Sequence, residues 1–167
     1  MSGPNPRAAA VAALVRQEQD GFSNLILDAE LRRQRLEGRE KAFASAIFYT
    51  VLEHQGTLDY ILSQFLPKGL AKLDPQVREI LRAALAQARY MQVPVSAAVN
   101  EAVKLTRAFK KSSASGLVNA VLRKVAQNKS NLPPLPEGNI ARLSVAYSHP
   151  QWLVKKLVSL LGTKEAE

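Results

Sequence analysis

The 167-residue chain contains no cysteine, and its two histidines, His54 and His149, lie far apart in the sequence. The missing cysteines exclude disulfide bonds, thiolate metal ligands and a cysteine nucleophile within this sequence. Two distant histidines do not form a pattern typical of a zinc site. The eight glycines never cluster into a phosphate-binding loop, and no Ser-His-Asp set or pair of carboxylates stands out. These gaps favour a binding module over an enzyme, and we expect no cofactor or metal in this chain.

Long apolar runs are also missing, since none approaches the ~20 residues that a membrane-spanning helix needs. The N-terminal AAAVAALV stretch continues directly into Arg16, Gln17 and Glu18, without the small-residue cleavage site of a signal peptide. We therefore expect a cytoplasmic protein. Apolar residues still make up 47% of the chain, which is enough for a packed core and is not typical of disorder.

Apolar residues recur at helical spacing along the whole chain, and no segment has the alternation of a strand. Asn5 before Pro6 is a typical helix start, and Gly21 is expected to end that helix. Gly56 is expected to close a later helix, and Asp74 to cap the most regular one. The pattern predicts eight or nine helices with short connections, over about residues 6–20, 24–35, 39–55, 58–65, 75–91, 97–107, 115–125 and from 148 onward.

Two neighbouring predicted helices share an unusual arrangement of polar residues. In AAVNEAVKLTR, Asn100 flanks a buried apolar stripe, and cations follow it at Lys104 and Arg107. In SGLVNAVLRKV, Asn119 flanks the stripe, and Arg123 lies one turn beyond it. We expect the asparagines mainly to register the two helices, while the lysines and arginines face a ligand.

Positive charge is concentrated in these two helices and the turn between them. Lys and Arg number 23 against 14 Asp and Glu, and +6 of the net +9 falls within residues 100–130. Such a surface suits a nucleic-acid backbone, because each neutralised phosphate releases counterions. The alternative is a solvated cationic face whose asparagines only bond neighbouring helices or loops.

At VPVSAAVNEAVKLTRAFKKSSASGLVNAVLRKV the sequence resembles the signature of the NusB family, in which a proline-initiated AVNEAV helix precedes a GLVNAVLRK helix. Earlier segments agree, including NPRAAAVAAL and LDPQVREILRAALAQARY, so the resemblance covers about residues 5–127. Many relatives have GLYQLLY where this chain has ALAQARYM, with Arg89 in place of an apolar residue. The following RLSVAYSHPQWLVKKL is similar to the linker of bacterial rRNA cytosine-5 methyltransferases of the RsmB (Sun/Fmu) family.

This resemblance implies an all-α fold of two packed three-helix subdomains with a C-terminal helical linker. Residues 1–130 would form a NusB-like RNA-binding domain, and residues 131–167, which open with the proline-rich NLPPLPEGN, would lead to a methyltransferase domain. In that family the methyltransferase domain carries the catalytic cysteines and binds S-adenosylmethionine. We therefore expect this chain to be a non-enzymatic fragment that directs methylation of 16S rRNA. Its expected partners are that rRNA and its own methyltransferase domain, and we expect it to bind neither DNA nor a membrane. The RNA contacts implied are Arg7, Lys104, Arg107, Lys110, Lys111, Arg123 and Lys124, with Asn100 and Asn119 as secondary candidates.

Three other functions stay open at this point. A transcription antitermination factor of the NusB type would bind RNA and a ribosomal protein, although the proline-rich connector and the tail argue against it. A docking module for the catalytic domain would show little salt-dependent RNA binding, whereas an RNA reader would lose affinity steeply with salt. A DNA-binding domain is disfavoured because no helix-turn-helix spacing is evident.

Overall fold

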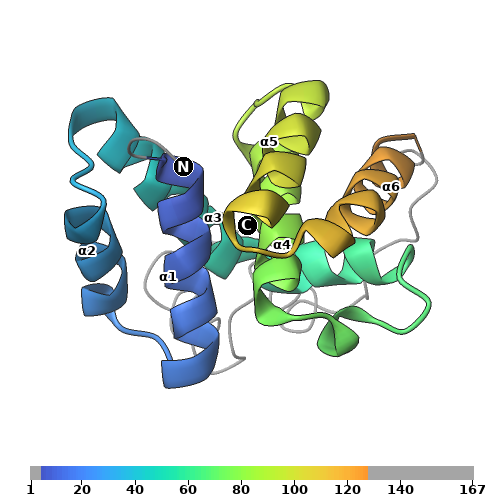
Figure 1. Cartoon of the computed structure of the whole chain (residues 1–167), viewed down its shortest axis with the longest axis horizontal. Helices are drawn as coiled ribbons and strands as arrows, with labels where there is room; N and C mark the ends of the chain where they lie inside the picture. The colour runs from blue at the N-terminus through green and yellow to red at the C-terminus, as the bar shows by residue number, and fades with distance from the viewer. Residues whose placement is uncertain (1–4, 128–167) are drawn as a thin grey trace, which may run out of the picture.

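The computed structural model describes residues 5–127, which form six α-helices and two short 3-10 turns without any strand (Figure 1). The predicted all-α fold class is thereby confirmed. The predicted linker over residues 131–167 and its final helix lie outside the described residues. In chain order the elements are α1 Pro6–Asp20, α2 Asn24–Arg33, α3 Gly38–Ser63, η1 Leu70–Lys72, α4 Pro75–Tyr90, α5 Val95–Ala108, η2 Ser112–Ala114 and α6 Ser115–Gln127.

Local signals set both ends of α1. The side-chain oxygen of Asn5 accepts a hydrogen bond from the Ala8 amide at 3.1 Å, which satisfies one of the unpaired N–H groups at the helix start. At the other end, Gly21 adopts φ +82° and donates its amide to the Gln17 carbonyl. Only glycine takes this conformation without strain, so the predicted boundaries of this helix are confirmed.

The predicted break near Gly56 is confirmed as a kink, but its position differs by two residues. Element α3 consists of two helical segments that meet at this kink. The backbone leaves helical geometry two residues before Gly56, at His54 (φ −117°, ψ 16°). There the imidazole stacks on the Tyr90 ring of α4, with ring centroids 3.8 Å apart. A contact between distant helices, rather than the local glycine, therefore marks the bend.

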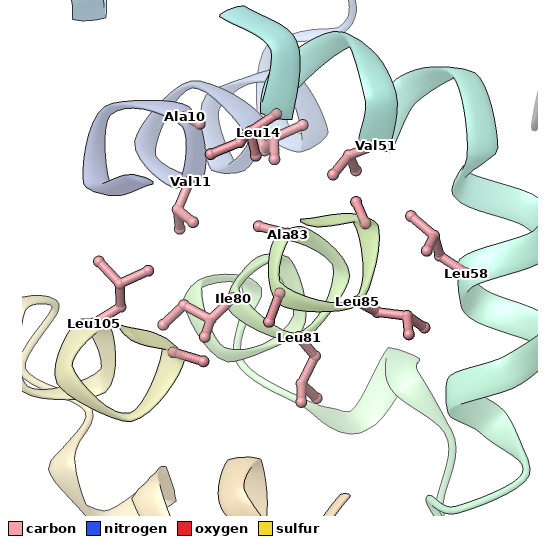
Figure 2. Close-up of a cluster of buried hydrophobic side chains, with 14 of the residues drawn as sticks. Ala10, Val11, Leu14, Val51, Leu58, Ile80, Leu81, Ala83, Leu85 and Leu105 are labelled. Carbon is pink, nitrogen blue, oxygen red and sulfur yellow. The ribbon is translucent and has the colours of Figure 1, made fainter. Parts of the chain in front are cut away.

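Helix α4 is the centre of the fold. It packs against α1 and α3 on one side and against α5 on the other, so that α1–α3 and α4–α6 form two joined three-helix subdomains. Figure 2 shows Leu14 of α1, Leu58 of α3 and Leu105 of α5 on different sides of α4, which carries Ile80 and Leu81. These side chains are almost completely buried, and the resulting core fixes the position of α5 and α6 relative to the first subdomain.

One large apolar residue of α2 faces solvent. Leu25 is 71% exposed, whereas Ile26 and Leu27 are buried. Leu25 lies in the first turn of the helix, where the Ser23 hydroxyl accepts from its amide at 3.2 Å. No helix of the described part combines the length and apolarity needed to cross a bilayer.

Candidate nucleic-acid interface

Helices α5 and α6 lie side by side and are joined by the short turn that contains η2 (Figure 1). Between them is an open cleft of about 520 Å³ near that turn. Residues of α5 at positions i, i+4 and i+7 share one side of a helix, which brings Asn100, Lys104 and Arg107 into the cleft wall. Asn119 of α6 lies opposite them. Four of the nine predicted contact residues therefore line one cleft.

The cations of the cleft wall differ in how far they are already neutralised. The Lys104 ammonium lies 3.1 Å from a carboxylate oxygen of Glu101, in an ion pair that is largely exposed on the lysine side. Arg107, the other cation of the wall, is exposed and forms no ion pair within residues 5–127. Since exposed ion pairs contribute only about 0–1 kcal/mol, a phosphate can replace Glu101 as the partner of Lys104 at little cost.

The first turn of α6 forms part of the same cleft. Ser115 and Gly116 begin the helix and both line the cleft wall. The Ser115 amide already donates to the Ser112 carbonyl of η2, so the start of α6 contributes mainly the positive end of its helix dipole, which favours an anion. A Cβ atom at Gly116 would meet nothing within 4 Å, so the backbone there is open to close approach. Cationic side chains and a helix N-terminus thus converge on one space.

The two asparagines do not register the helices as expected. The Asn119 side-chain oxygen accepts from Nε of Arg123 at 2.8 Å, one turn along the same helix. Asn100 is exposed and makes no side-chain hydrogen bond to another described residue. Neither amide joins α5 to α6, because the apolar stripes of the two helices hold them together instead. Both amides remain available at the surface of the cleft.

A comparison with known families decides where this fold belongs. The sequence model of the NusB family matches residues 4–127 of the chain, which include both subdomains. The chain belongs to the NusB family. Among solved structures, the fold is similar to that of antitermination factors NusB and NusE in complex with dsRNA, with a TM-score of 0.67, 18% identity, and 73% of this chain and 93% of that chain covered.

Curated relatives of this NusB domain are methyltransferases. The chain is 31% identical, over all of its length, to probable ribosomal RNA small subunit methyltransferase B of Bacillus subtilis, of which it covers 38%. It is 35% identical to ribosomal RNA small subunit methyltransferase B of Thermus thermophilus, with 97% of this chain and 37% of that protein covered. The chain therefore spans somewhat more than a third of the length of these relatives.

Arg7 of the NusB domain lies away from the cleft and holds helices together. Its Nε donates to the Gln87 side chain at 2.7 Å, and its guanidinium carbon lies 4.9 Å from the centre of the Phe43 ring. Its Nη1 also lies 3.7 Å from Glu101, the acid that pairs with Lys104. Arg7 thus connects α1 to α3, α4 and α5, and it reaches the cleft only through Glu101.

The remaining predicted contacts surround the cleft without lining it. Lys110 adopts φ +59° in the turn and is exposed. Lys111 lies in the same turn, where its ammonium pairs with Asp74 at 3.2 Å. That ion pair replaces the predicted cap, because the Asp74 side chain makes no capping bond to α4. Arg123 and Lys124 are exposed on α6, farther from the turn.

A second surface hollow, between α2 and α3, shows why the cleft is the better anion site. That hollow has a volume of about 660 Å³ and is lined by Arg32, Arg35 and Lys41. However, Asp28 and Glu37 line it as well and offset most of the positive charge. No acidic residue lines the α5–α6 cleft within the described part of the chain. The only carboxylate that pairs with a cation of the cleft among the described residues is Glu101, which lies outside the lining and contacts Lys104 but not Arg107.

Sequence reasoning missed a buried charge network that joins α1, α3 and α4. Arg78 binds Glu18 through two nitrogens, and Arg82 donates to both oxygens of Asp59 at 2.7 and 2.8 Å. Nη1 of Arg82 donates to Oε2 of Glu79 at 2.6 Å. Glu18 and Arg78 are 60 positions apart, so no local spacing signals their meeting.

Glu79 is the unusual member of this network. Its side chain is 1% exposed, and its Oε1 has no hydrogen-bond donor among the described residues. Burial, followed by the neighbouring Glu18 carboxylate, raises the pKa of Glu79 to about 8. Burial also acts on Glu18, but the hydrogen bonds and charge of Arg78 outweigh it and lower the pKa of that carboxyl. A proton on Glu79 therefore faces an ionised Glu18, within a network that joins α1, α3 and α4.

Proposed function

We propose that this NusB domain binds small-subunit (16S) rRNA through the α5–α6 cleft and so targets a methyltransferase to its substrate. The observation that carries the proposal is the convergence of Lys104, Arg107 and the α6 N-terminus on a cleft without acidic lining. Phosphate contacts of this kind position a nucleic acid without reading its sequence. The two amides, Asn100 and Asn119, supply donors and acceptors for an exposed base or a 2′-hydroxyl.

The relatives support the methyltransferase context over a free-standing antitermination factor. The match to the Bacillus subtilis protein extends over the whole chain, beyond the residues that the NusB family model covers. In our proposal, transfer of the methyl group from S-adenosylmethionine to carbon 5 of a cytosine belongs to a domain outside this sequence. The NusB domain contributes binding and orientation of the rRNA.

The test is a titration of the chain with a small-subunit rRNA hairpin at several salt concentrations. The double variant Lys104→Gln and Arg107→Gln removes both cations of the cleft wall. Each lost phosphate contact reduces the slope of log K against log salt by about 0.7 on single-stranded RNA, so the slope falls by about 1.4. If the variant and the unchanged chain bind equally at 1 M salt, this change of slope corresponds to about a 25-fold lower affinity of the variant at 0.1 M salt.

The matched control is Arg32→Gln with Lys41→Gln in the α2–α3 hollow, which removes the same charge from another exposed site. We expect this control to weaken binding only slightly and to leave the slope near that of the unchanged chain. Equal losses in the two double variants would show that net charge alone governs binding and would overturn the assignment to the cleft. The absence of salt-dependent binding by the folded, unchanged chain would overturn RNA binding itself.

A further inference from the structure

A second hollow on α5 and α6 lies at the opposite end from the RNA cleft. It is a groove of about 230 Å³ where α3 and α4 meet the start of α5 and the end of α6. Every lining residue except Arg89 is apolar. Six of them contribute most of the wall: Ile61, Leu85, Ala88, Val95, Val99 and Val125.

This groove suits an apolar side-chain face better than a small molecule. A site for a small ligand has a few polar groups that fix its orientation, usually in a larger pocket of about 300–1,000 Å³. Here the one polar side chain, Arg89, donates to the hydroxyl of Tyr90 at 3.1 Å and lies over that ring, at 5.5 Å from its centre. Val95 is 44% exposed in the wall, so part of this apolar surface meets water in the described residues.

The chain itself leaves α6 at the edge of this groove. Val125 and Ala126 line the wall, and α6 ends at Gln127. Forty further residues follow, and among them Leu153, Leu157 and Leu161 recur at helical spacing, with Trp152 and Leu160 beside that stripe. A helix of this length is marginal in water unless its apolar stripe is covered. The tether of residues 128–150 also keeps the segment at high effective concentration near the groove.

We propose that the segment over residues 151–161 docks its leucine stripe into the α3–α6 groove of the same chain. Docking would cover the exposed wall around Val95 and give the segment the apolar partner that its pattern requires. The RNA cleft lies at the turn end of α5 and α6, so this docking is independent of the proposed rRNA binding. It would also set the direction in which the rest of a longer protein leaves the NusB domain.

The chain's lack of cysteine makes disulfide trapping a clean test in the full-length sequence. The pair Val95→Cys and Leu157→Cys places one thiol in the groove wall and one in the leucine stripe. Two matched pairs serve as controls: Val95→Cys with Lys155→Cys, on the opposite side of the segment, and Ala46→Cys with Leu157→Cys, at an exposed position of α3 outside the groove. We expect mild oxidation to give several-fold more intrachain disulfide in the groove pair than in either control. Equal yields, or a mainly interchain product from a second copy, would overturn the proposal.

Trp152 offers a second readout, because it is the only tryptophan and lies beside the stripe. We expect Val95→Asp to shift its emission to longer wavelength and to raise its quenching by acrylamide about two-fold, with unchanged helix content. Val95→Ile is the matched control and should leave the emission in place. Docking in this groove would be contradicted if acrylamide quenched Trp152 in the unchanged chain as strongly as it quenches a fully exposed tryptophan. An emission of Trp152 that Val95→Asp leaves unchanged would contradict it as well.

Discussion

Glu79→Gln tests the buried charge network most sharply, because the structure predicts its sign and its pH window. The pKa of Glu79 rises from an ordinary value of 4.5 to about 8 in the folded chain. Between these values the folded state holds a proton that the unfolded state has released. The stability contributed by this proton is complete below pH 4.5 and is lost as the pH rises through 8.

Linkage gives the magnitude of the effect. A group that is protonated only in the folded state lowers the free energy of unfolding by about 1.4 kcal/mol for each pH unit by which the pH rises within its window. Glu18 acts in the opposite direction, since its pKa is lowered, but its contribution is lost only below pH 4.5. The two carboxyls of the network therefore act in separate pH ranges.

Glutamine at position 79 has the shape of the protonated acid and can still accept from Arg82 and donate to Glu18. We expect the variant to match the unchanged chain near pH 5 and to become relatively more stable as the pH rises to 8. Urea unfolding followed by circular dichroism at pH 5, 6, 7 and 8 measures this difference. Glu40→Gln, at an exposed position of α3, controls for the loss of one carboxyl from the chain.

Two results would refute this reasoning. A Glu79→Gln variant that keeps the pH slope of the unchanged chain would show that another group titrates. A variant destabilised by about 3–5 kcal/mol at pH 5 would show that Glu79 is ionised in the fold, because that is the cost of breaking a buried ion pair.

Two further predictions concern the cleft and the core. Glu101→Gln removes the acid that pairs with both Lys104 and Arg7. We expect rRNA affinity to rise about two- to five-fold, which is the equivalent of one exposed ion pair. An unchanged affinity in a hairpin titration would show that the RNA binds elsewhere. Leu14→Ala should cost about 2–5 kcal/mol of unfolding free energy, whereas Leu25→Ala should change it by no more than about 0.5 kcal/mol, because the first side chain is fully buried and the second is 71% exposed. Urea midpoints measure both, and similar losses for the two leucines would contradict the packing described.

The sequence predicted features that depend on neighbouring residues. The start and end of α1 follow from Asn5, Pro6 and Gly21, whose effects are local, and the structure confirms them. The clustering of Lys104, Arg107 and Asn119 follows from helical periodicity once α5 and α6 pack together. Family resemblance supplied the arrangement of the six helices, which periodicity alone does not determine.

Contacts between distant segments could not be read from local patterns. Gly56 indicated a break in this part of α3, but the kink lies at His54, whose ring stacks on Tyr90 of α4, a partner that local patterns do not reveal. No residue near Lys111 in the sequence indicates an ion pair, yet its ammonium pairs with Asp74 at the start of α4. The positions of these partners depend on how the helices cross, which requires the three-dimensional fold.

The central claim is that rRNA phosphates occupy the α5–α6 cleft. Amide chemical-shift mapping of the isotope-labelled chain during titration with a small-subunit rRNA hairpin tests it most directly. We expect the largest changes at Arg107, Gly116 and Asn119, with small changes at Arg32 and Lys41 in the α2–α3 hollow. Changes concentrated in the α2–α3 hollow, with the cleft amides unmoved, would contradict it.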